Sequence, residues 1–452
     1  MIQKNIPRLI WITHATERPL LVSTIKTASM KHNLPALIVF ISAVMILPLS
    51  CLKDQTSESY TFYRPVYKTR AEVRAAAQST LPMEVTTPGK IFLLNNFVFL
   101  NEVDKGIHII DISDPSKPVN ISFLRIPGCM DMAVRGNYLY ADCYTDLVTI
   151  DIADPRKAQV KQFIQGVFPH RRYSNGFVAD TNLVITEWQK VDTTVVSTNG
   201  ELPQGGGNLF WLKSDSRAFT SMAASAAPGM QNGTGGSMAR FGLKDDRLYT
   251  ISWSDMKVFN TSVAERPSYV KTVNFAQGDI ETIFPYKERL FIGSQTGMFI
   301  YDVTDRDNPK KLGQFTHARA CDPVVADDTH AYVTLRSNNR CAGFLNQLDV
   351  LDINNLTAPK LLKTYPFTEP AGLGKDGNLL FICDGKDGVK ILDAANPTSI
   401  TLIKTISGME AFDVIPWRGT AIVTAKDGLY LMNYTNPAQA SITGRITLNQ
   451  AK

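Results

Sequence analysis

A repeat of about 40 residues limits what this chain can fold into more than any other feature of its sequence. In each copy an apolar stretch ends on Asp or Asn. These anchor residues are Asp111, Asp151, Asn260, Asp302, Asp352, Asp393 and Asn433. Most neighbouring anchors are 40 to 50 residues apart, but Asp151 and Asn260 are separated by more than twice that distance. We therefore expect one further, degraded copy near Trp211, which would make eight.

Each copy has the composition of four short strands in a meander. Alternating apolar stretches such as residues 138–140 and 147–150 are typical of strands, and Gly136-Asn137 supplies a turn between the first two. The Asp-Pro block after the anchor ends the third strand, because proline removes a ladder donor. A β-sandwich shows no such regular motif. The repeat therefore predicts an all-β fold, a β-propeller with eight four-stranded blades, and seven blades as the alternative.

The motifs Ile-Ile-Asp-Ile-Ser-Asp-Pro at 109–115 and Val-Thr-Ile-Asp-Ile-Ala-Asp-Pro at 148–155 resemble the LVIVD-repeat family of bacterial surface or secreted propellers. The resemblance extends over residues 89–450. It implies the fold and an extracellular setting, but it implies no particular activity, because the family is characterised by its repeat and not by a reaction.

The first 50 residues have the pattern of an export leader. Residues 34–49 are apolar and uncharged, which is shorter than the roughly 20 residues that a membrane helix needs. A basic start at Met30 favours a leader over 30–50, with 1–29 an overrun of the start site. Ser50-Cys51 resembles the lipobox of bacterial lipoproteins, so we expect a lipid on Cys51. A secreted protein cut nearby and an uncleaved signal anchor are the alternatives.

The sequence after the leader predicts where the protein resides. Leu52-Lys53-Asp54 resembles the export signal that sends Bacteroidetes lipoproteins to the outer cell surface. We expect an outer-membrane protein facing the exterior and attached only through its lipid. Residues 51–88 would form a tether and a short helix, opened by a capping box at Thr69 and Glu72 and continuing to Gln78. The propeller would occupy residues 89–450.

Net charge gives no indication of a nucleic-acid partner. The chain carries a formal charge of +5, but most of it lies in the leader, and the remainder has 42 basic and 41 acidic residues. A near-neutral mature chain lacks the electrostatic footprint of a nucleic-acid-binding protein.

Strand order predicts which loops share one end of the propeller. The connections that enter the first strand of a blade, and those from the second strand to the third, lie at the same end. The large insertions, 189–207, 218–238 and 337–347, all belong to this set. Long loops on one end of a rigid scaffold are the usual place for binding, although tolerated surface variation is the alternative.

Cysteines at this end would form two disulfides in an oxidising compartment. The spacing pairs Cys129 with Cys143 and Cys321 with Cys341, with buried thiols as the alternative, and leaves Cys383 as a buried apolar residue. No Cys/His spacing suggests zinc. The glycine runs at 205–207 and 233–236 lack the lysine of a phosphate loop, so we interpret them as flexible.

Polar residues near the starts of the inner strands form the candidate site at the upper pore and the adjoining top face. They are Asp131, His170, Arg171, Arg172, Trp188, Arg240, Asp279, Glu281, His317, Arg319, Asp322, Glu369 and Asp413. Carboxylates in a ring could hold calcium, but such acids more often cap strand ends, so we expect no resident cofactor. Trp188 and Tyr173 could stack on a sugar, although core packing is the commoner role of such aromatics.

No pattern of catalytic residues emerges. The leading hypothesis is a monomeric, non-catalytic binding module for a protein or glycan. The alternatives are a propeller-type polysaccharide hydrolase or lyase that uses pore acids and histidine, and a structural component of an outer-membrane complex. Fold alone decides none of these.

Overall fold

The computed structural model describes residues 56–168, 183–197, 230–276, 279–317, 323–337 and 345–448. The chain divides into two compact units. The larger, Thr61–Asp192 with Leu209–Lys452, contains every blade. The smaller, Met1–Tyr60 with Thr193–Asn208, contains the far ends of strands β1 (Thr56–Thr69) and β11 (Leu183–Ser197), which pair in a two-stranded sheet. No helix in these described ranges is long and apolar enough to cross a membrane.

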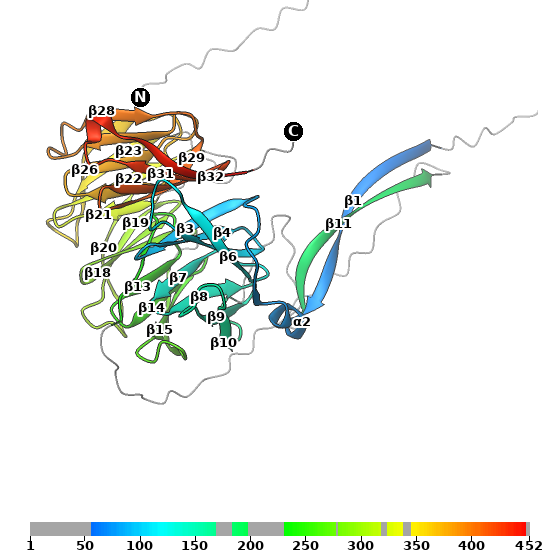
Figure 1. The fold of residues 1–452 in the computed structure, drawn as a ribbon. Coiled ribbons are helices and arrows are strands. Elements are labelled where there is room, and N and C mark those ends of the chain that lie inside the picture. The colour runs from blue at the N-terminus through cyan, green and yellow to red at the C-terminus, as the bar shows by residue number, and fades with distance from the viewer. Residues whose placement is uncertain are drawn as a thin grey trace, which may run out of the picture. The chain divides into compact units, whose positions relative to one another are not determined.

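The larger unit is a β-propeller of seven four-stranded blades (Figure 1). Blades 1 and 2 contain β3 (Pro88–Leu94), β4 (Phe97–Glu102), β5 (Gly106–Asp111), β6 (Val119–Arg125), β7 (Met132–Arg135), β8 (Tyr138–Cys143), β9 (Asp146–Asp151) and β10 (Gln159–Ile164). Blades 3 and 4 contain β13 (Phe241–Lys244), β14 (Arg247–Ile251), β15 (Asp255–Asn260), β16 (Ser268–Asn274), β17 (Ile280–Tyr286), β18 (Arg289–Ser294), β19 (Gly297–Asp302) and β20 (Lys310–Thr316).

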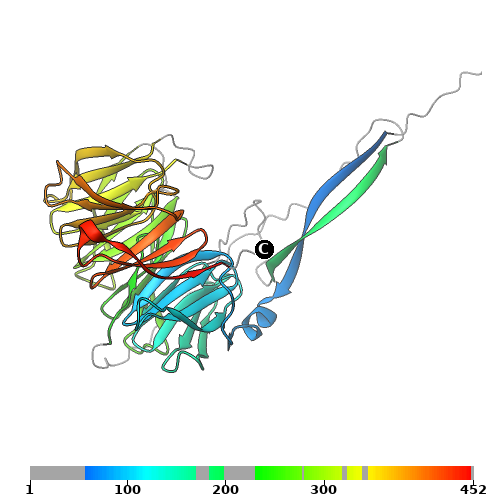
Figure 2. The ribbon, with the colours of Figure 1, turned by 45° about the horizontal axis from the view of Figure 1, so that its top comes forward.

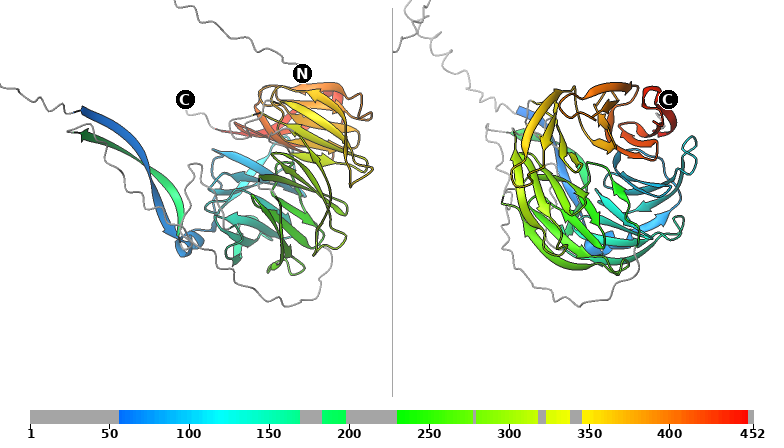
Figure 3. Two further views of the ribbon diagram at one scale, coloured as in Figure 1. Left: turned by 180° about the vertical axis from the view of Figure 1, so that it is seen from behind. Right: turned by 90° about the vertical axis from the view of Figure 1, so that its left-hand side faces the viewer.

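Blades 5 to 7 complete the ring. They contain β21 (Val324–Ala326), β22 (His330–Leu335), β23 (Gln347–Asp352), β24 (Lys360–Pro366), β25 (Leu373–Asp376), β26 (Leu379–Cys383), β27 (Val389–Asp393), β28 (Thr401–Ile406), β29 (Ala411–Trp417), β30 (Thr420–Ala425), β31 (Gly428–Asn433) and β32 (Ser441–Thr447). A 3-10 turn, η1 (Pro437–Gln439), precedes β32. The blades follow one another in chain order around the ring (Figure 3, right).

The prediction of eight blades is wrong, and the seven-blade alternative is confirmed. The long interval between Asp151 and Asn260 is an insertion between β10 and β13. Within its described part, β11 pairs with β1, where the sequence suggested a tether, and β12 (Thr234–Gly235) pairs with β3. Trp211 lies outside the described residues. The seven anchors correspond to the seven blades, so the long interval between Asp151 and Asn260 does not contain the degraded eighth repeat that its length suggested.

The anchor residues end the third strand of each blade with an Asx turn. Each side-chain oxygen accepts the backbone N–H two residues ahead, at 2.7 to 3.0 Å. This bond turns the chain toward the outer strand, and it explains why only Asp or Asn occupies the position.

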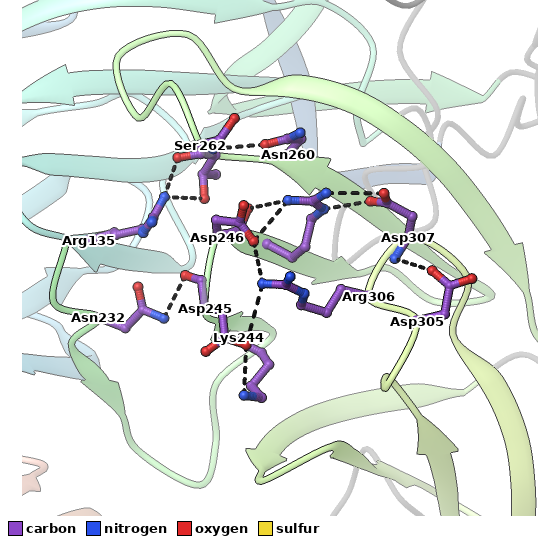
Figure 4. A network of polar contacts seen from close by, with 12 residues as sticks. Arg135, Asn232, Lys244, Asp245, Asp246, Asn260, Ser262, Asp305, Arg306 and Asp307 are labelled. Atoms are coloured by element: carbon purple, nitrogen blue, oxygen red, sulfur yellow. Dashed lines mark hydrogen bonds and ion pairs between the residues drawn. The ribbon is translucent and has the colours of Figure 1, made fainter. Parts of the chain in front are cut away.

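The turn after each anchor also fastens neighbouring blades together. The Tyr140 hydroxyl in blade 2 donates to the backbone carbonyl of Ala264 in blade 3 at 2.8 Å, and the Tyr249 hydroxyl in blade 3 donates to the backbone carbonyl of Arg306 in blade 4 at 2.9 Å. Around the second contact, Arg306 pairs with Asp246 at 2.8 Å (Figure 4). Because such bonds join turns to buried strands, they fix the angle between blades.

The ring closes by side-chain packing between blades 7 and 1, which lie side by side in Figure 2. Val98, Leu100 and Ile110 form one buried cluster with Ile422 and Leu431. All four strands of blade 7 come from one continuous stretch, and the extra strand β2 (Gln78–Thr80) pairs with the outer strand β6 of blade 1. Among the strands that the structure describes, the closure therefore involves no exchange between the chain ends.

A short helix, α2 (Arg70–Ala75), precedes blade 1. The predicted capping box is present: Glu72 N donates to Thr69 Oγ at 3.3 Å, and Thr69 N donates to Glu72 at 2.7 Å. The helix ends at Ala75, earlier than the expected Gln78, because Gln78 belongs to β2. Arg74 pairs with Asp146 at 2.5 Å and attaches the helix to blade 2.

Candidate functional site

The two ends of the ring differ in their connections. At one end, the turn end, two or three residues join the first strand to the second, and seven residues join the third to the fourth in every blade. At the other, the loop end, the connections vary in length, and the longest ones run from β10 to β13 and from β22 to β23. The predicted insertions 189–207 and 218–238 are parts of one connection.

Residues 230–240, here called the central segment, cross the channel from the turn end to the loop end. At the turn end Gly136 N donates to Gln231 O at 2.7 Å, and Asn232 Nδ2 donates to Asp245 O at 2.9 Å. The segment then pairs with β3 through β12. At the loop end Arg240 N donates to Asp131 at the start of blade 2. The part of the 218–238 insertion that the structure describes thus runs through the channel.

Hydrogen bonds connect the central segment to six of the seven blades. Ala239 O accepts from Ile283 N of blade 4 at 2.8 Å. Ser237 Oγ accepts from Leu373 N of blade 6 at 2.8 Å and donates to Asp413 of blade 7 at 3.0 Å. With the contacts above, the segment bonds to blades 1, 2, 3, 4, 6 and 7, so it acts as a strut inside the ring.

Glycines let the central segment approach the walls closely. A Cβ at Gly236 would lie 1.9 Å from Asp413 Oδ2, and one at Gly233 would lie 2.5 Å from the Phe92 ring. The interpretation of these glycines as flexible is not supported: their role in the structure is close packing.

Asp413, predicted as a pore acid, holds the central segment. It is buried, and its Oδ1 accepts from Ser237 N at 3.2 Å, Ser237 Oγ at 3.0 Å and Val414 N at 3.0 Å. Burial raises the pKa of Asp413 to about 7, although these hydrogen bonds favour the ionised form. The bonds make Asp413 a structural acid inside the ring.

Four charged residues lie at the loop end of the channel, and we call them the collar: Lys90, Asp131, Arg240 and Glu281. All but Lys90 were predicted. Lys90 pairs with Asp131 at 2.5 Å. Burial lowers the pKa of Lys90, against the attraction of Asp131, and burial raises the pKa of Glu281, which accepts from Gln295 at 2.9 Å. The Arg240 side chain is exposed and donates to Glu281 O at 3.3 Å.

Of the remaining predicted residues, Asp279 lies near the collar, because its charge helps to raise the pKa of Glu281, whereas Glu369 and Trp188 lie elsewhere. Asp279 accepts from Thr296 Oγ1 at 3.3 Å, and His317 N donates to Thr296 O at 3.2 Å. Glu369 pairs with Arg336 at 3.6 Å between blades 5 and 6. Trp188 lies on β11, outside the blades. The predicted residues outside the described ranges are Cys51, His170, Arg171, Arg172, Tyr173, Arg319, Cys321, Asp322 and Cys341.

The predicted Cys129–Cys143 disulfide is not present. Both residues are buried thiols, and the Cys129 thiol donates to Asp131 O at 3.6 Å. Asn101 Nδ2 also lies 3.5 Å from the Cys129 sulfur, so the sulfur belongs to a local polar network. Cys383 is buried, as expected. Within the described residues no group of three or more His, Cys, Asp or Glu is arranged to hold a metal.

Sequence reasoning missed a cavity at the turn end. It has a volume of 330 Å³ and lies between the central segment and the first strands of blades 4 to 7. A neighbouring cavity of 320 Å³ between blades 4 and 5 shares Tyr286 and Asp327 with it. Most of the lining residues are strand residues that a sequence cannot distinguish from core, and the cavity exists only because residues 234–237 stand opposite them.

Comparisons with known proteins agree with the repeat. The LVIVD repeat model matches residues 89–122, 128–161, 341–366 and 376–407. No curated protein matches the chain.

Solved structures with some likeness include the computationally designed Ika8 protein (10% identity, TM-score 0.48, covering 82% of this chain and 92% of that one). They also include a Lactobacillus plantarum protein (13%, 0.48, covering 74% and 89%) and the Neurospora crassa Pan2 WD40 domain (9%, 0.42, covering 71% and 80%). None of these likenesses bears on function. The architecture and the four matched segments together identify the chain as a β-propeller that carries LVIVD repeats.

Proposed function

We propose that this protein is a non-catalytic binding module, displayed outside the cell through a lipid on Cys51, that holds a protein or glycan at the loop end. The observation that carries this proposal is the difference between the two ends of the ring. The connections of variable length and the collar lie at the loop end, while the first-to-second and third-to-fourth turns are nearly uniform in length. A rigid ring with variable loops at one end is a common binding architecture.

The bonding of Asp131 and Asp413, the two most buried of the predicted pore acids, also favours binding over hydrolysis. Asp131 accepts from Lys90, from Arg240 N and from Met132 N, and Asp413 accepts from Ser237 and Val414. A glycosidase acid or nucleophile needs an oxygen directed at substrate, and the oxygens of these two acids hold the central segment and the strand starts.

Binding is tested by a thermal-shift screen of the purified protein against glycans and by cross-linking on intact cells. A ligand at 100 times its Kd adds about 2.7 kcal/mol to the free energy of unfolding. Arg240→Ala removes an exposed collar side chain and should weaken binding, whereas Arg445→Ala on the outer strand of blade 7 should not. Equal binding by both variants would place the ligand elsewhere.

The hydrolase alternative depends on Glu281, whose raised pKa is a property of a general acid. If the protein cleaves a glycan and Glu281→Gln abolishes turnover while ligand binding is kept, the non-catalytic proposal fails. If the protein is recovered only within a stable outer-membrane complex and binds no free ligand, the result would instead favour its role as a structural component of that complex.

The lipid anchor makes a separate prediction. Cys51→Ser should move the protein from the membrane fraction to the soluble fraction and abolish incorporation of labelled palmitate in cells. The control is Cys383→Ser, which changes a buried cysteine of the ring. Membrane retention of the Cys51 variant would favour an uncleaved signal anchor.

A further inference from the structure

The turn end of the channel holds a site that the proposed function does not use. Its 330 Å³ cavity is bounded on one side by Thr234, Gly235 and Ser237 of the central segment. The other walls come from the first strands of blades 4, 5, 6 and 7. The cavity continues from Ser237 and Leu373, deep in the channel, to the turns at Asp327 and Gly377.

The walls of this cavity are mainly apolar. The apolar lining residues are Phe284, Val325, Ala326, Leu373, Val414, Ile415 and Pro416. Small-molecule sites are typically concave, apolar and supplied with a few polar groups that fix orientation. The volume is about twice the roughly 150 Å³ that accommodates benzene, which corresponds to two fused rings. The rings of Phe284 and Tyr286 offer aromatic edges and faces to such a ligand.

Two charged groups, Lys375 and Asp327, line the rim of the cavity. Lys375 pairs with Asp327 at 3.0 Å and donates to Gly377 O at 2.5 Å. The centroid of the Tyr332 ring also lies 5.5 Å from Lys375 Nζ, which is a weaker cation–π contact. An ammonium carries three N–H donors, so the third donor can take a ligand carboxylate.

The carboxylate of Asp327, beside Lys375, already accepts other hydrogen bonds. Asp327 accepts from Thr329 N at 3.0 Å and His330 N at 2.8 Å. Burial opposes its ionisation, but these bonds and Lys375 outweigh burial and hold the pKa of Asp327 below its ordinary value. Of the two charged groups, the lysine is therefore the one that can take a new partner, and that partner is an anion.

We propose that this cavity binds a small aromatic carboxylate of about two-ring size, with the rings against the apolar walls and the carboxylate on Lys375. The site is separate from the loop end, so its failure would leave the proposed function untouched. The class follows from three features together: the volume, the apolar walls, and Lys375 at the rim beside a carboxylate that already accepts other hydrogen bonds.

The test titrates the full-length protein with 2-naphthoate by isothermal titration calorimetry. Lys375→Met should weaken binding about tenfold or more, since a charged hydrogen bond contributes about that factor. Thr234→Phe adds a ring to the cavity from an exposed position on the central segment and should abolish binding. Lys287→Met, at the rim of the neighbouring 320 Å³ cavity, is the matched control and should bind as the wild type does.

A neutral analogue, 2-naphthylmethanol, separates charge from apolar contact. It should bind the wild type more weakly than 2-naphthoate does, and Lys375→Met should remove that preference. Thermal unfolding of each variant verifies that it is folded. If Lys375→Met does not fold, the proposal is tested by Thr234→Phe and by the affinities of the wild type for the two ligands. Absence of binding at millimolar 2-naphthoate, equal affinity for both ligands in the wild type, or weakening by Lys287→Met alone would overturn the proposal.

Discussion

Asp413 illustrates how a single side chain can act at once as a structural bond and as a titratable group. It lies inside the ring and takes three hydrogen bonds on one oxygen. Desolvation favours the protonated form, so its pKa rises from 3.8 to about 7. A carboxyl whose folded-state pKa is raised contributes stability that is complete below the unfolded pKa and is lost as pH rises through the folded value.

We therefore expect Asp413 to make the free energy of unfolding fall between about pH 4 and pH 7, by a contribution on the order of 4 kcal/mol. Asp413→Asn keeps an acceptor for Ser237 but cannot ionise. Urea unfolding at pH 5 and pH 8 should show the wild type losing stability relative to Asp413→Asn at the higher pH. If the difference between the two proteins is the same at both pH values, Asp413 does not titrate in this range.

At the scale of elements, the anchors were predictable and the central segment was not. Each Asx turn depends on residues within two positions of Asp111 and its equivalents, and the capping box at Thr69 depends on a neighbour three positions away. Local chemistry of this kind can be read from sequence. The central segment depends on Asp413 and Leu373, which are 176 and 136 positions from Ser237. No local pattern records such pairings, and for the same reason Lys90 of the collar and the turn-end cavity became visible only in the structure. Strand order was enough to predict the other three collar residues, Asp131, Arg240 and Glu281.

Gly236→Ala tests the central segment. The added Cβ would lie 1.9 Å from Asp413 Oδ2, so either the segment or blade 7 must shift. Overpacking of this kind costs about 1–3 kcal/mol, and we expect a lower melting temperature by calorimetry. Thr234→Ala, at an exposed position of the same segment, is the control and should leave the melting temperature nearly unchanged. Equal melting for both variants would show that the segment is not held against the wall.

At the scale of the whole molecule, the ring depends on contact between its first and last blades. Ile422 is fully buried in the cluster that joins blade 7 to Val98 and Leu100 of blade 1. Because the described strands of blades 1 and 7 are not exchanged, side-chain packing and the central segment hold the ring closed.

Ile422→Ala should destabilise the protein by about 2–5 kcal/mol through loss of transfer energy and the cavity it leaves. Hydrogen exchange should quicken in β3 to β5 of blade 1 as well as in blade 7, and less in blade 4 on the far part of the ring. Faster exchange confined to blade 7 would indicate that the two blades do not stabilise each other.

The central segment also has a consequence for synthesis on the ribosome. Ser237 leaves the ribosome 176 residues before the Asp413 that it bonds. At roughly 5–20 residues per second, that interval lasts about 10–35 s. During it, a nascent chain holds six blades or fewer around a central segment whose partner in blade 7 does not yet exist. The early blades can form from their own local turns, but the central segment is completely bonded only after the last blade has been made. An unfinished chain therefore differs from the finished one in that its central segment is not yet held in the channel.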